Sequence, residues 1–202
     1  MSSTHLPGNQ NESEINADQS EWIKKLAYSK FNYWGGYVAN LILITALLVR
    51  AFTSGEPISL FKFFGLTAAG LFTYTFTEYL AHRFLYHVMT SPFTKGHGLH
   101  HDDPKGLLGL PWYFPYPVII GLYFLISWAT NAPGSVAIFM GMWWLGFVLY
   151  CAIHHSIHHY NFKWTWFKAL KAHHKVHHAR EETNFGVVST HWDKLFGTYF
   201  TK

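Results

Sequence analysis

Four long stretches of the chain are apolar on every side, and short polar or turn-forming segments separate them. They span residues 34–52, 58–81, 110–129 and 134–153. Each is close to the ~20 residues that a helix needs to cross a bilayer. A soluble helical bundle is the alternative, but its helices would keep a polar stripe facing water, and these stretches lack one. The pattern therefore predicts an all-α integral membrane protein with about four transmembrane helices.

The residues before the first apolar stretch divide into two parts. Residues 1–20 are polar and predict a disordered tail, without the basic and apolar regions of a signal peptide. Residues 21–33 mix Trp22, Ile23 and Leu26 with lysines, which is typical of an amphipathic helix in the membrane interface. Residues 34–202 would then form one membrane domain.

Charge indicates how these stretches are oriented. The chain has 15 Lys and Arg residues, and all but Arg50 and Lys62 lie before the first stretch, in the 82–111 connection or after the fourth stretch. By the positive-inside rule these three regions are cytoplasmic. Nucleic-acid binding is disfavoured because the basic residues flank apolar spans and form no stripe. The single cysteine excludes an internal disulfide and a cysteine-rich zinc module.

Histidines gather in four clusters at the cytoplasmic ends of the second and fourth stretches and in the segments beside them. The clusters are His82-x4-His87, His97-x2-His100-His101, His154-x3-His158-His159 and His174-x2-His177-His178. Neutral imidazole is the commonest protein ligand for transition metals. The spacing therefore predicts a histidine-rich site for two metal ions within a cytoplasmic helical cap. It argues against the alternative of a solvated histidine tract. Iron, zinc and copper all accept such ligands.

Helical spacing also predicts how the ligands divide between the two ions. Adjacent residues diverge by about 100° on a helix, so His100 and His101 should bind different ions, and His177 and His178 likewise. Residues three or four apart share a face. We expect the pairs His97/His100 and His174/His177 each to share one ion, and His154/His158 to point one way. Metal affinity should fall as pH drops through ~6.5, where free imidazole protonates.

Other catalytic signatures are missing from the sequence. It contains no His-Glu-x-x-His, no Cys-x-x-Cys and no Gly-x-Ser-x-Gly. A histidine-dominated metal site beside acyl chains suits the activation of dioxygen against an unactivated C–H bond of a membrane lipid.

The four clusters resemble the histidine boxes of the membrane fatty acid hydroxylase/sterol desaturase superfamily, and most closely those of fatty acid 2-hydroxylases. The resemblance covers about residues 70–200 and rests on stretches 78–87, 97–101, 170–174, 184–188 and 192–198. It implies two iron ions, replaceable by zinc on overexpression, with dioxygen as co-substrate. It implies a membrane monooxygenase that hydroxylates C2 of a fatty acid or sphingolipid/ceramide acyl group. The implied metal ligands are His82, His87, His97, His100, His101, His154, His158, His174, His177 and His178.

Several residues near the boxes have less certain roles. His159 matches a motif histidine but could equally support a ligand. Glu78 lies four residues before His82 and is predicted to orient it; Asp193 could orient a box histidine or cap a turn. The remaining nearby histidines are given no metal role: His155, His173 and His191. The aromatic residues Trp143, Trp144, Phe147 and Tyr150 could line an acyl-chain tunnel or pack against lipid.

The sequence also departs from the family pattern. Cys151 replaces an acidic residue before the third box, and the Asp and Arg that follow the second box are missing. The stretch before the first span leaves no room for the N-terminal haem domain of the yeast and animal 2-hydroxylases. We therefore expect a separate electron-transfer protein, a ferredoxin or cytochrome with its reductase. The candidate docking residues, which could instead contact anionic lipid headgroups, are Lys163, Lys168, Lys171 and Lys175.

Two other functions compete with acyl-chain hydroxylation. A carotenoid or sterol oxygenase or desaturase of the same superfamily would use a similar metal site, although the second box and residues 192–198 are closer to fatty acid hydroxylases. A histidine-rich metal transporter or metal-binding membrane protein would place ligands within the spans near the midplane, whereas these histidines lie at span ends and in connections. The expected location is the bacterial inner membrane or the endoplasmic reticulum membrane, with the active site on the cytoplasmic face.

Overall fold

The computed structural model describes residues 21–109, 111 and 113–201, and these residues form helices and connections without a strand. The predicted tail 1–20 lies outside the described residues. Residues 21–27 are helical, and the chain then turns at Ser29, which caps the next helix. The elements that follow are α2 (Lys30–Thr53), α3 (Leu60–Leu80), the π-helix η1 (Ala81–Tyr86), α4 (Pro92–Asp102), α5 (Tyr116–Thr130), α6 (Pro133–His159), α7 (Thr165–Ala179) and α8 (His191–Leu195).

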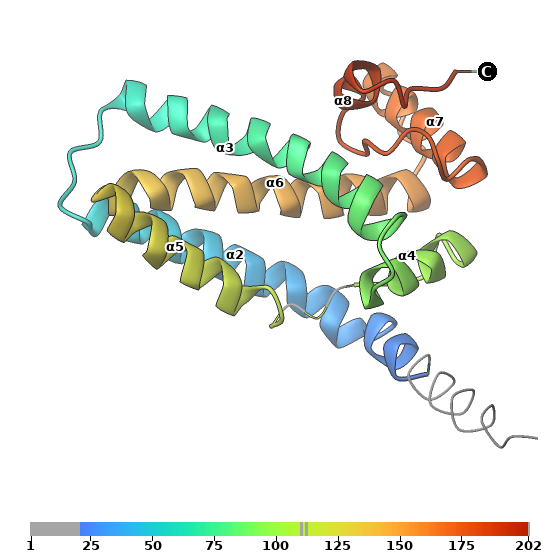
Figure 1. The fold of residues 1–202 in the computed structure, drawn as a ribbon, viewed down its shortest axis with the longest axis horizontal. Helices are drawn as coiled ribbons and strands as arrows, with labels where there is room; N and C mark the ends of the chain where they lie inside the picture. The colour runs from blue at the N-terminus through green and yellow to red at the C-terminus, as the bar shows by residue number, and fades with distance from the viewer. Residues whose placement is uncertain (1–20, 110, 112, 202) are drawn as a thin grey trace, which may run out of the picture.

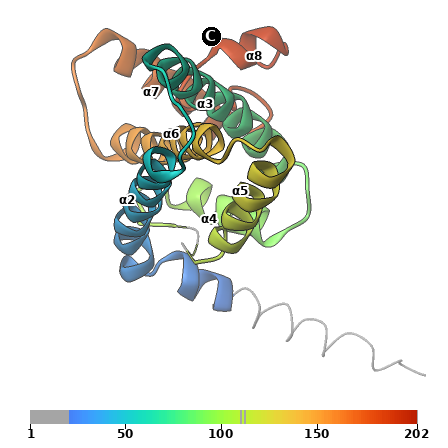
Figure 2. The same cartoon turned by 90° about the vertical axis from the view of Figure 1, so that its left-hand side faces the viewer.

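Four long helices lie side by side, and the short helices gather at one end of them (Figure 1). Helix α6 is central and contacts α2, α3 and α5, an arrangement that is clear along the bundle axis (Figure 2). The connections α2–α3 and α5–α6 lie at the opposite end from α4, α7 and α8. The four predicted apolar stretches thus correspond to the four long helices, and this arrangement brings every histidine cluster to the same end of the bundle.

The helices differ in how well each suits a membrane span. Helices α2 and α6 are long and apolar enough to cross a membrane. Helix α5 begins later than predicted and has only 15 residues, while α3 has 21 residues but includes Lys62 and Glu78. Large apolar side chains nevertheless remain exposed on these helices, such as Ile42 (65%), Phe61 (90%) and Trp128 (82%). An exposed apolar surface of this extent indicates association with a membrane.

Two glycines let α3 and α6 approach closely. A Cβ atom added at Gly70 would lie 2.6 Å from the carbonyl oxygen of Phe139, and one at Gly146 would lie 2.5 Å from the Tyr74 ring. Small residues at such contacts allow backbones to pack tightly where apolar burial alone contributes little, as in a membrane. The close contact fixes α6, which carries the third histidine cluster, against α3, which leads directly into η1 and His82.

At the end far from the histidines, a carboxylate in the α2–α3 connection links α3 to the start of α6. Glu56 accepts hydrogen bonds from the backbone N–H groups of Gly134 (2.8 Å) and Ser135 (3.0 Å), from the Ser135 hydroxyl and from Lys62 Nζ (2.6 Å). These N–H groups belong to the first turn of α6 and have no partner within the helix. Burial favours the neutral acid, but the hydrogen bonds from Lys62 and Ser135 outweigh it and lower the pKa of Glu56 to about 2.

Replacing Glu56 with Gln should destabilise the bundle by about 1–2 kcal/mol, because the charged acceptor at the α6 N-terminus is lost. This corresponds to a fall in Tm of about 2–8 °C for a chain of this size, measurable by thermal unfolding in detergent. Because the folded pKa is depressed, the contribution is present above pH ~4.5 and disappears as pH falls toward 2. Glu21→Gln, which changes an exposed carboxylate, is the control; equal Tm values for both variants would refute this role.

Candidate metal centre

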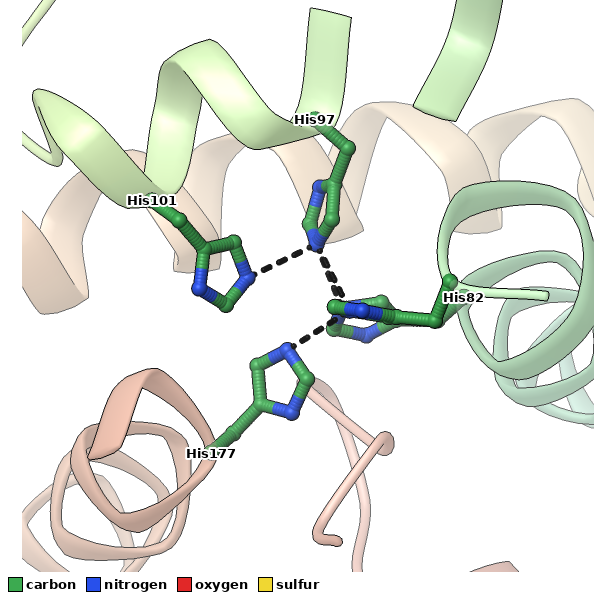
Figure 3. Close-up of side chains that lie close together, drawn as sticks. His82, His97, His101 and His177 are labelled. Atoms are coloured by element: carbon green, nitrogen blue, oxygen red, sulfur yellow. Dashed lines mark hydrogen bonds between the residues drawn. The ribbon is translucent and has the colours of Figure 1, made fainter. Parts of the chain in front are cut away.

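Ten histidines meet at the end of the bundle in two groups of five. The first group contains His82, His87, His97, His101 and His177, and the second contains His100, His154, His158, His174 and His178. Within each group the ligand atoms all lie within 4.8 Å of one another. His82 of η1, His97 and His101 of α4 and His177 of α7 point toward a common centre (Figure 3). His87, the C-terminal cap of η1, completes the group. These ten residues are the ten that the sequence predicted as metal ligands.

The spacing of the ring nitrogens fits a transition metal better than hydrogen bonding. His97 Nε2 lies 3.0 Å from Nε2 of His82, 3.1 Å from that of His87 and 3.0 Å from that of His101. A ring nitrogen carries either one proton or one in-plane lone pair, so it cannot form three such bonds. Ligands ~2.1 Å from a metal and at right angles to each other lie about 3.0 Å apart. The residues of this group therefore fit one ion.

The second group has the same spacing. His174 Nε2 lies 2.9 Å from Nε2 of both His154 and His158, and 3.1 Å from that of His178. His100 Nε2 lies 3.2 Å from that of His178. This group therefore fits a second ion, with helices α4, α6 and α7 each supplying at least one nitrogen.

The division of histidines between the two groups agrees with one part of the predicted pattern and differs from another. His100 and His101 fall in different groups, and so do His177 and His178, as expected. The predicted sharing within the pairs His97/His100 and His174/His177 is wrong: the pairs that share a group are His97/His101, His174/His178 and His154/His158. Residues four apart differ by about 40° around a helix and residues three apart by about 60° in the opposite sense. The fourth residue therefore points into the same group, and the third points into the other group.

The π-helix η1 explains the unusual spacing of the first cluster. His82 and His87 are five residues apart and would diverge by about 140° on an α-helix. The wider turn of a π-helix, with hydrogen bonds between residues five apart, brings such positions onto one face. His82 lies in η1 and His87 is its C-terminal cap. Both therefore reach the first group, an outcome that α-helical periodicity did not foresee.

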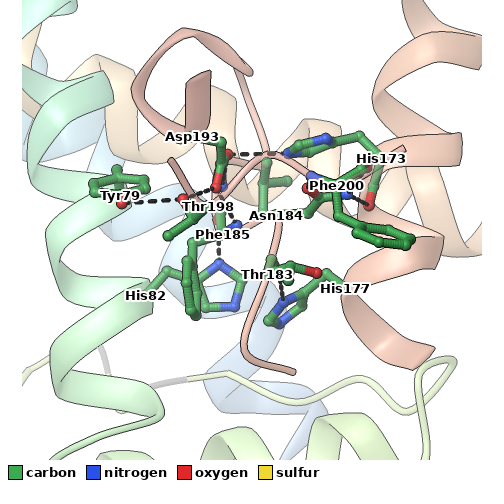
Figure 4. Close-up of polar contacts among 12 residues, drawn as sticks. Tyr79, His82, His173, His177, Thr183, Asn184, Phe185, Asp193, Thr198 and Phe200 are labelled. Atoms are coloured by element: carbon green, nitrogen blue, oxygen red, sulfur yellow. Dashed lines mark hydrogen bonds and ion pairs between the residues drawn. The ribbon is translucent and has the colours of Figure 1, made fainter. Parts of the chain in front are cut away.

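Backbone carbonyls set the tautomer of two ligands. His82 Nδ1 donates to the carbonyl of Phe185, and His177 Nδ1 donates to the carbonyl of Thr183 at 2.8 Å (Figure 4). A carbonyl oxygen only accepts, so each Nδ1 holds the proton and each Nε2 directs its lone pair at the centre of the group. Both rings are thus held in the state and orientation that metal binding requires.

Burial keeps the gathered imidazoles neutral. Loss of contact with water, together with repulsion among neighbouring rings, lowers the pKa of His100 to about 2 and that of His178 to about 3. Burial also lowers the pKa of His177 to about 3, although its hydrogen bond to Thr183 partly opposes the shift. The free rings are therefore unprotonated at neutral pH, as metal ligands must be.

The predicted supporting carboxylates act on the backbone of the segment after α7. Glu78 does not contact the His82 ring as predicted; it accepts a hydrogen bond from the N–H of Val187 (2.9 Å). Asp193 accepts from the N–H groups of Phe185 and Gly186, both at 2.8 Å, and contacts His173 Nε2 at 3.0 Å. His173 was given no metal role, and the structure places it outside both groups, as the partner of Asp193.

Among the residues that the structure describes, the remaining histidines outside the two groups are His155, His159 and His191, and each has an aromatic partner. His159 stacks on His155 with ring centres 4.2 Å apart, and His155 Nδ1 lies 2.8 Å from the Tyr33 hydroxyl. His191 stacks on Phe72 of α3. Each of these contacts lies outside the ten-histidine centre.

A cavity of about 400 Å³ connects the centre with the N-terminal helices. His97, His100, His154 and His158 line this cavity, and so do Trp22, Ile23 and Leu26 of the N-terminal helix. Of the four aromatic residues considered for a tunnel, Phe147 and Tyr150 line this cavity, as does Cys151. Trp143 and Trp144 instead donate hydrogen bonds to Thr77 (3.1 Å) and Asn40 (2.9 Å).

The candidate docking lysines do not form one uniform surface. Lys171 Nζ donates to the Tyr160 carbonyl (2.7 Å) and to Asn161 Oδ1 (2.8 Å), and so closes the connection between α6 and α7. Lys163, Lys168 and Lys175 are exposed. Three of the four lysines are thus free to meet a partner or a lipid surface, whereas Lys171 has a structural role.

Comparison with known proteins finds relatives whose names describe hydroxylases. The fatty acid hydroxylase family matches residues 67–198. A dihydroceramide fatty acyl 2-hydroxylase of Arabidopsis thaliana is 33% identical over 144 residues, covering 66% of this chain and 60% of that protein. Human fatty acid 2-hydroxylase is 30% identical over 193 residues, covering 88% of this chain and 50% of the human protein. The chain thus spans only part of the length of these relatives.

A solved structure has the same fold. The structure of full-length scs7p, in which only the hydroxylase domain is visible, superimposes with a TM-score of 0.69 at 28% identity. The match covers 86% of this chain and 69% of that one. The family match extends over well more than half of the sequence and contains all ten gathered histidines. The chain therefore belongs to the fatty acid hydroxylase family.

Proposed function

We propose that this protein hydroxylates a lipid acyl chain at C2, in a fatty acid or a sphingolipid/ceramide, with two iron ions bound by the ten histidines. The observation that carries the proposal is the pair of five-histidine groups with one face open to a largely apolar cavity. The relatives named 2-hydroxylases support the choice of C2 over other positions.

The histidines divide the work of binding the two ions. His82, His87, His97, His101 and His177 would hold one ion, and His100, His154, His158, His174 and His178 the other. When bound, the two irons supply the dioxygen activation that an unactivated C–H bond requires. Zinc also accepts an all-imidazole donor set, so zinc is expected to occupy the site on overexpression, without turnover.

The cavity would bind and orient the acyl chain. Phe147 and Tyr150 offer apolar and aromatic surface next to His154, and Ile23 and Leu26 also line the cavity. Its volume falls within the range of small-molecule sites. An acyl chain that fills this space excludes water and places its carbon atoms beside the histidines that line it, which favours reaction at one position along the chain.

The membrane would surround the four long helices. Helices α2, α3, α5 and α6 would cross it, with α4, α7 and α8 forming the cytoplasmic cap. The exposed apolar side chains of the bundle and the positions of Lys and Arg support this orientation. Substrate would then enter from the bilayer or its interface without leaving an apolar environment.

Two external electrons are needed for each oxygen atom inserted, and a separate carrier would supply them. Lys163, Lys168 and Lys175 are exposed near the third and fourth histidine clusters. A positive surface steers an acidic ferredoxin or cytochrome to its docking site. Contact with anionic lipid headgroups is the competing role of these lysines.

The function is tested by reconstituting the purified protein with iron, ceramide-containing vesicles and dioxygen, with and without a ferredoxin–reductase system. Mass spectrometry should find an acyl species heavier by the mass of one oxygen atom, with fragments that place it at C2, and only when the carrier is present. A species lighter by two hydrogens would indicate desaturation instead. Conversion of a carotenoid or sterol, with no change in ceramide, would favour the competing oxygenase. Repeated turnover without any carrier would contradict the separate electron donor.

A further inference from the structure

The two histidine groups differ in the hydrogen bonds made by Nδ1, the ring nitrogen that points away from the centre of each group. We propose that the metal position of the first group binds its ion more tightly than that of the second, because segment 181–187 orients the first-group ligands alone. This inference rests on the proposed two-metal centre and adds an order of affinity to it. Asp193 is then a positioning residue that acts on the metal through this segment.

Four of the five first-group ligands face an acceptor in segment 181–187. The Nδ1 atoms of His82 and His177 donate to the carbonyls of Phe185 and Thr183. The Nδ1 atoms of His87 and His101 lie 3.6 and 3.5 Å from the two carboxylate oxygens of Glu181. The Glu181 contacts are longer than hydrogen bonds, and the carboxylate is 61% exposed, so the two carbonyls carry most of the orientation.

The second group lacks this support. Among the residues that the structure describes, the close nitrogen contacts of this group run through Nε2, toward the other histidines of the group. Two Nδ1 atoms are buried without a hydrogen-bond partner: that of His101 in the first group, which has a Glu181 carboxylate oxygen 3.5 Å away, and that of His174 in the second group. The ring orientation of His174 therefore depends on packing and on the metal itself, whereas that of His82 or His177 is set before metal binds.

Segment 181–187 is itself rigidly held. Asp193 is fully buried and accepts hydrogen bonds from Phe185 N, Gly186 N and the Thr198 hydroxyl, all at 2.8 Å. Asn184 adopts a left-handed φ of 57°, and its side chain exchanges two hydrogen bonds with the backbone of Phe200. A Cβ at Gly186 would lie 2.0 Å from the Ser189 carbonyl oxygen. The carbonyls of Thr183 and Phe185 consequently have fixed positions.

Such outer hydrogen bonds have a known effect on metal affinity. They fix the ring orientation and tautomer and raise the basicity of the ligating nitrogen, and their loss typically weakens binding by about 10–100-fold. Two of them act on the first group. We therefore expect the first position to hold its ion at least about tenfold more tightly than the second.

The test follows release of Zn²⁺ from the zinc-loaded, full-length protein during dialysis against a strong chelator, with bound metal measured by mass spectrometry. Wild type should lose one ion in a fast phase and the other in a slow phase. The variant His154→Ala/His158→Ala should keep only the slow ion, and His87→Ala/His97→Ala only the fast one. Asp193→Asn should accelerate the slow phase by about tenfold or more and leave the fast phase unchanged.

A matched pair of carboxylate changes separates orientation from general surface charge. Glu181→Gln should accelerate the slow phase by a smaller factor than Asp193→Asn, and Glu182→Gln, an exposed neighbour, should change neither phase. Release of both zinc ions in one phase would overturn the proposed difference in affinity between the two positions, but not the two-metal centre itself. Equal acceleration of both phases by Asp193→Asn would show a general loosening of the cap and would also overturn it. Wild type that binds fewer than two zinc ions would overturn the two-metal centre and this inference with it.

Discussion

Replacing His174 with Ala should lower the proposed acyl-chain hydroxylation by at least about 1000-fold, equivalent to about 4 kcal/mol in the activation barrier. His174 is fully buried and lies within 3.1 Å of three other ring nitrogens of its group. Its loss would remove one of the proposed metal ligands together with a fully buried ring. Metal content should fall from two ions per chain to about one, because the first group keeps all five of its histidines.

The control for this variant is His191→Ala, which removes a histidine stacked on Phe72 outside both groups. It should retain two ions per chain and nearly full activity. Metal analysis of the iron-loaded proteins, in parallel with lipid mass spectrometry, distinguishes the two variants. Two tightly bound ions in His174→Ala would mean that His174 is not a ligand, whatever happens to turnover.

Acidification should release the metals by unfolding the cap, at a pH clearly below the ~6.5 suggested by free imidazole. Burial lowers the pKa of His100 to about 2 and those of His177 and His178 to about 3. In the unfolded chain the same side chains take up protons near pH 6.5, so below that pH the unfolded state binds more protons. Stability therefore falls as pH drops from about 6.5 toward 3, by on the order of 1–2 kcal/mol for a buried histidine such as His177 at pH 5.

Metal content and tryptophan fluorescence should accordingly be lost together and cooperatively as pH is lowered. Long incubation with a chelator at each pH allows slow exchange to reach completion. Zinc-loaded His191→Ala should follow the same curve as wild type. Gradual loss of metal centred on pH 6.5, with the fluorescence of the folded protein unchanged, would show that the histidines titrate as exposed groups and would contradict the role of burial.

The sequence alone determined which residues come together. Histidines repeated at helical spacing beside apolar stretches identify metal ligands, because the same local periodicity controls both the helix and the face that each side chain occupies. The choice of the ten histidines, and the exclusion of residues such as His191, rested on the resemblance to the histidine boxes and needed no coordinates. The four apolar stretches likewise specified four helices, since length and apolar character are local properties, although helix α5 (Tyr116–Thr130) is shorter than its stretch.

Only the tertiary structure decided how those residues divide and what supports them. The second and fourth clusters are divided between the two groups, whereas His82/His87 and His154/His158 each stay in one group. This division depends on which neighbouring helix supplies the facing nitrogens, and the place of His87 in the first group depends on the π-helix. The carbonyls of Thr183 and Phe185 carry no side-chain signature at all, and the contact of Asp193 with His173 joins residues on separate segments. The contacts of His82 with Phe185 and of His173 with Asp193 join residues 103 and 20 positions apart, whose relative geometry no local pattern encodes.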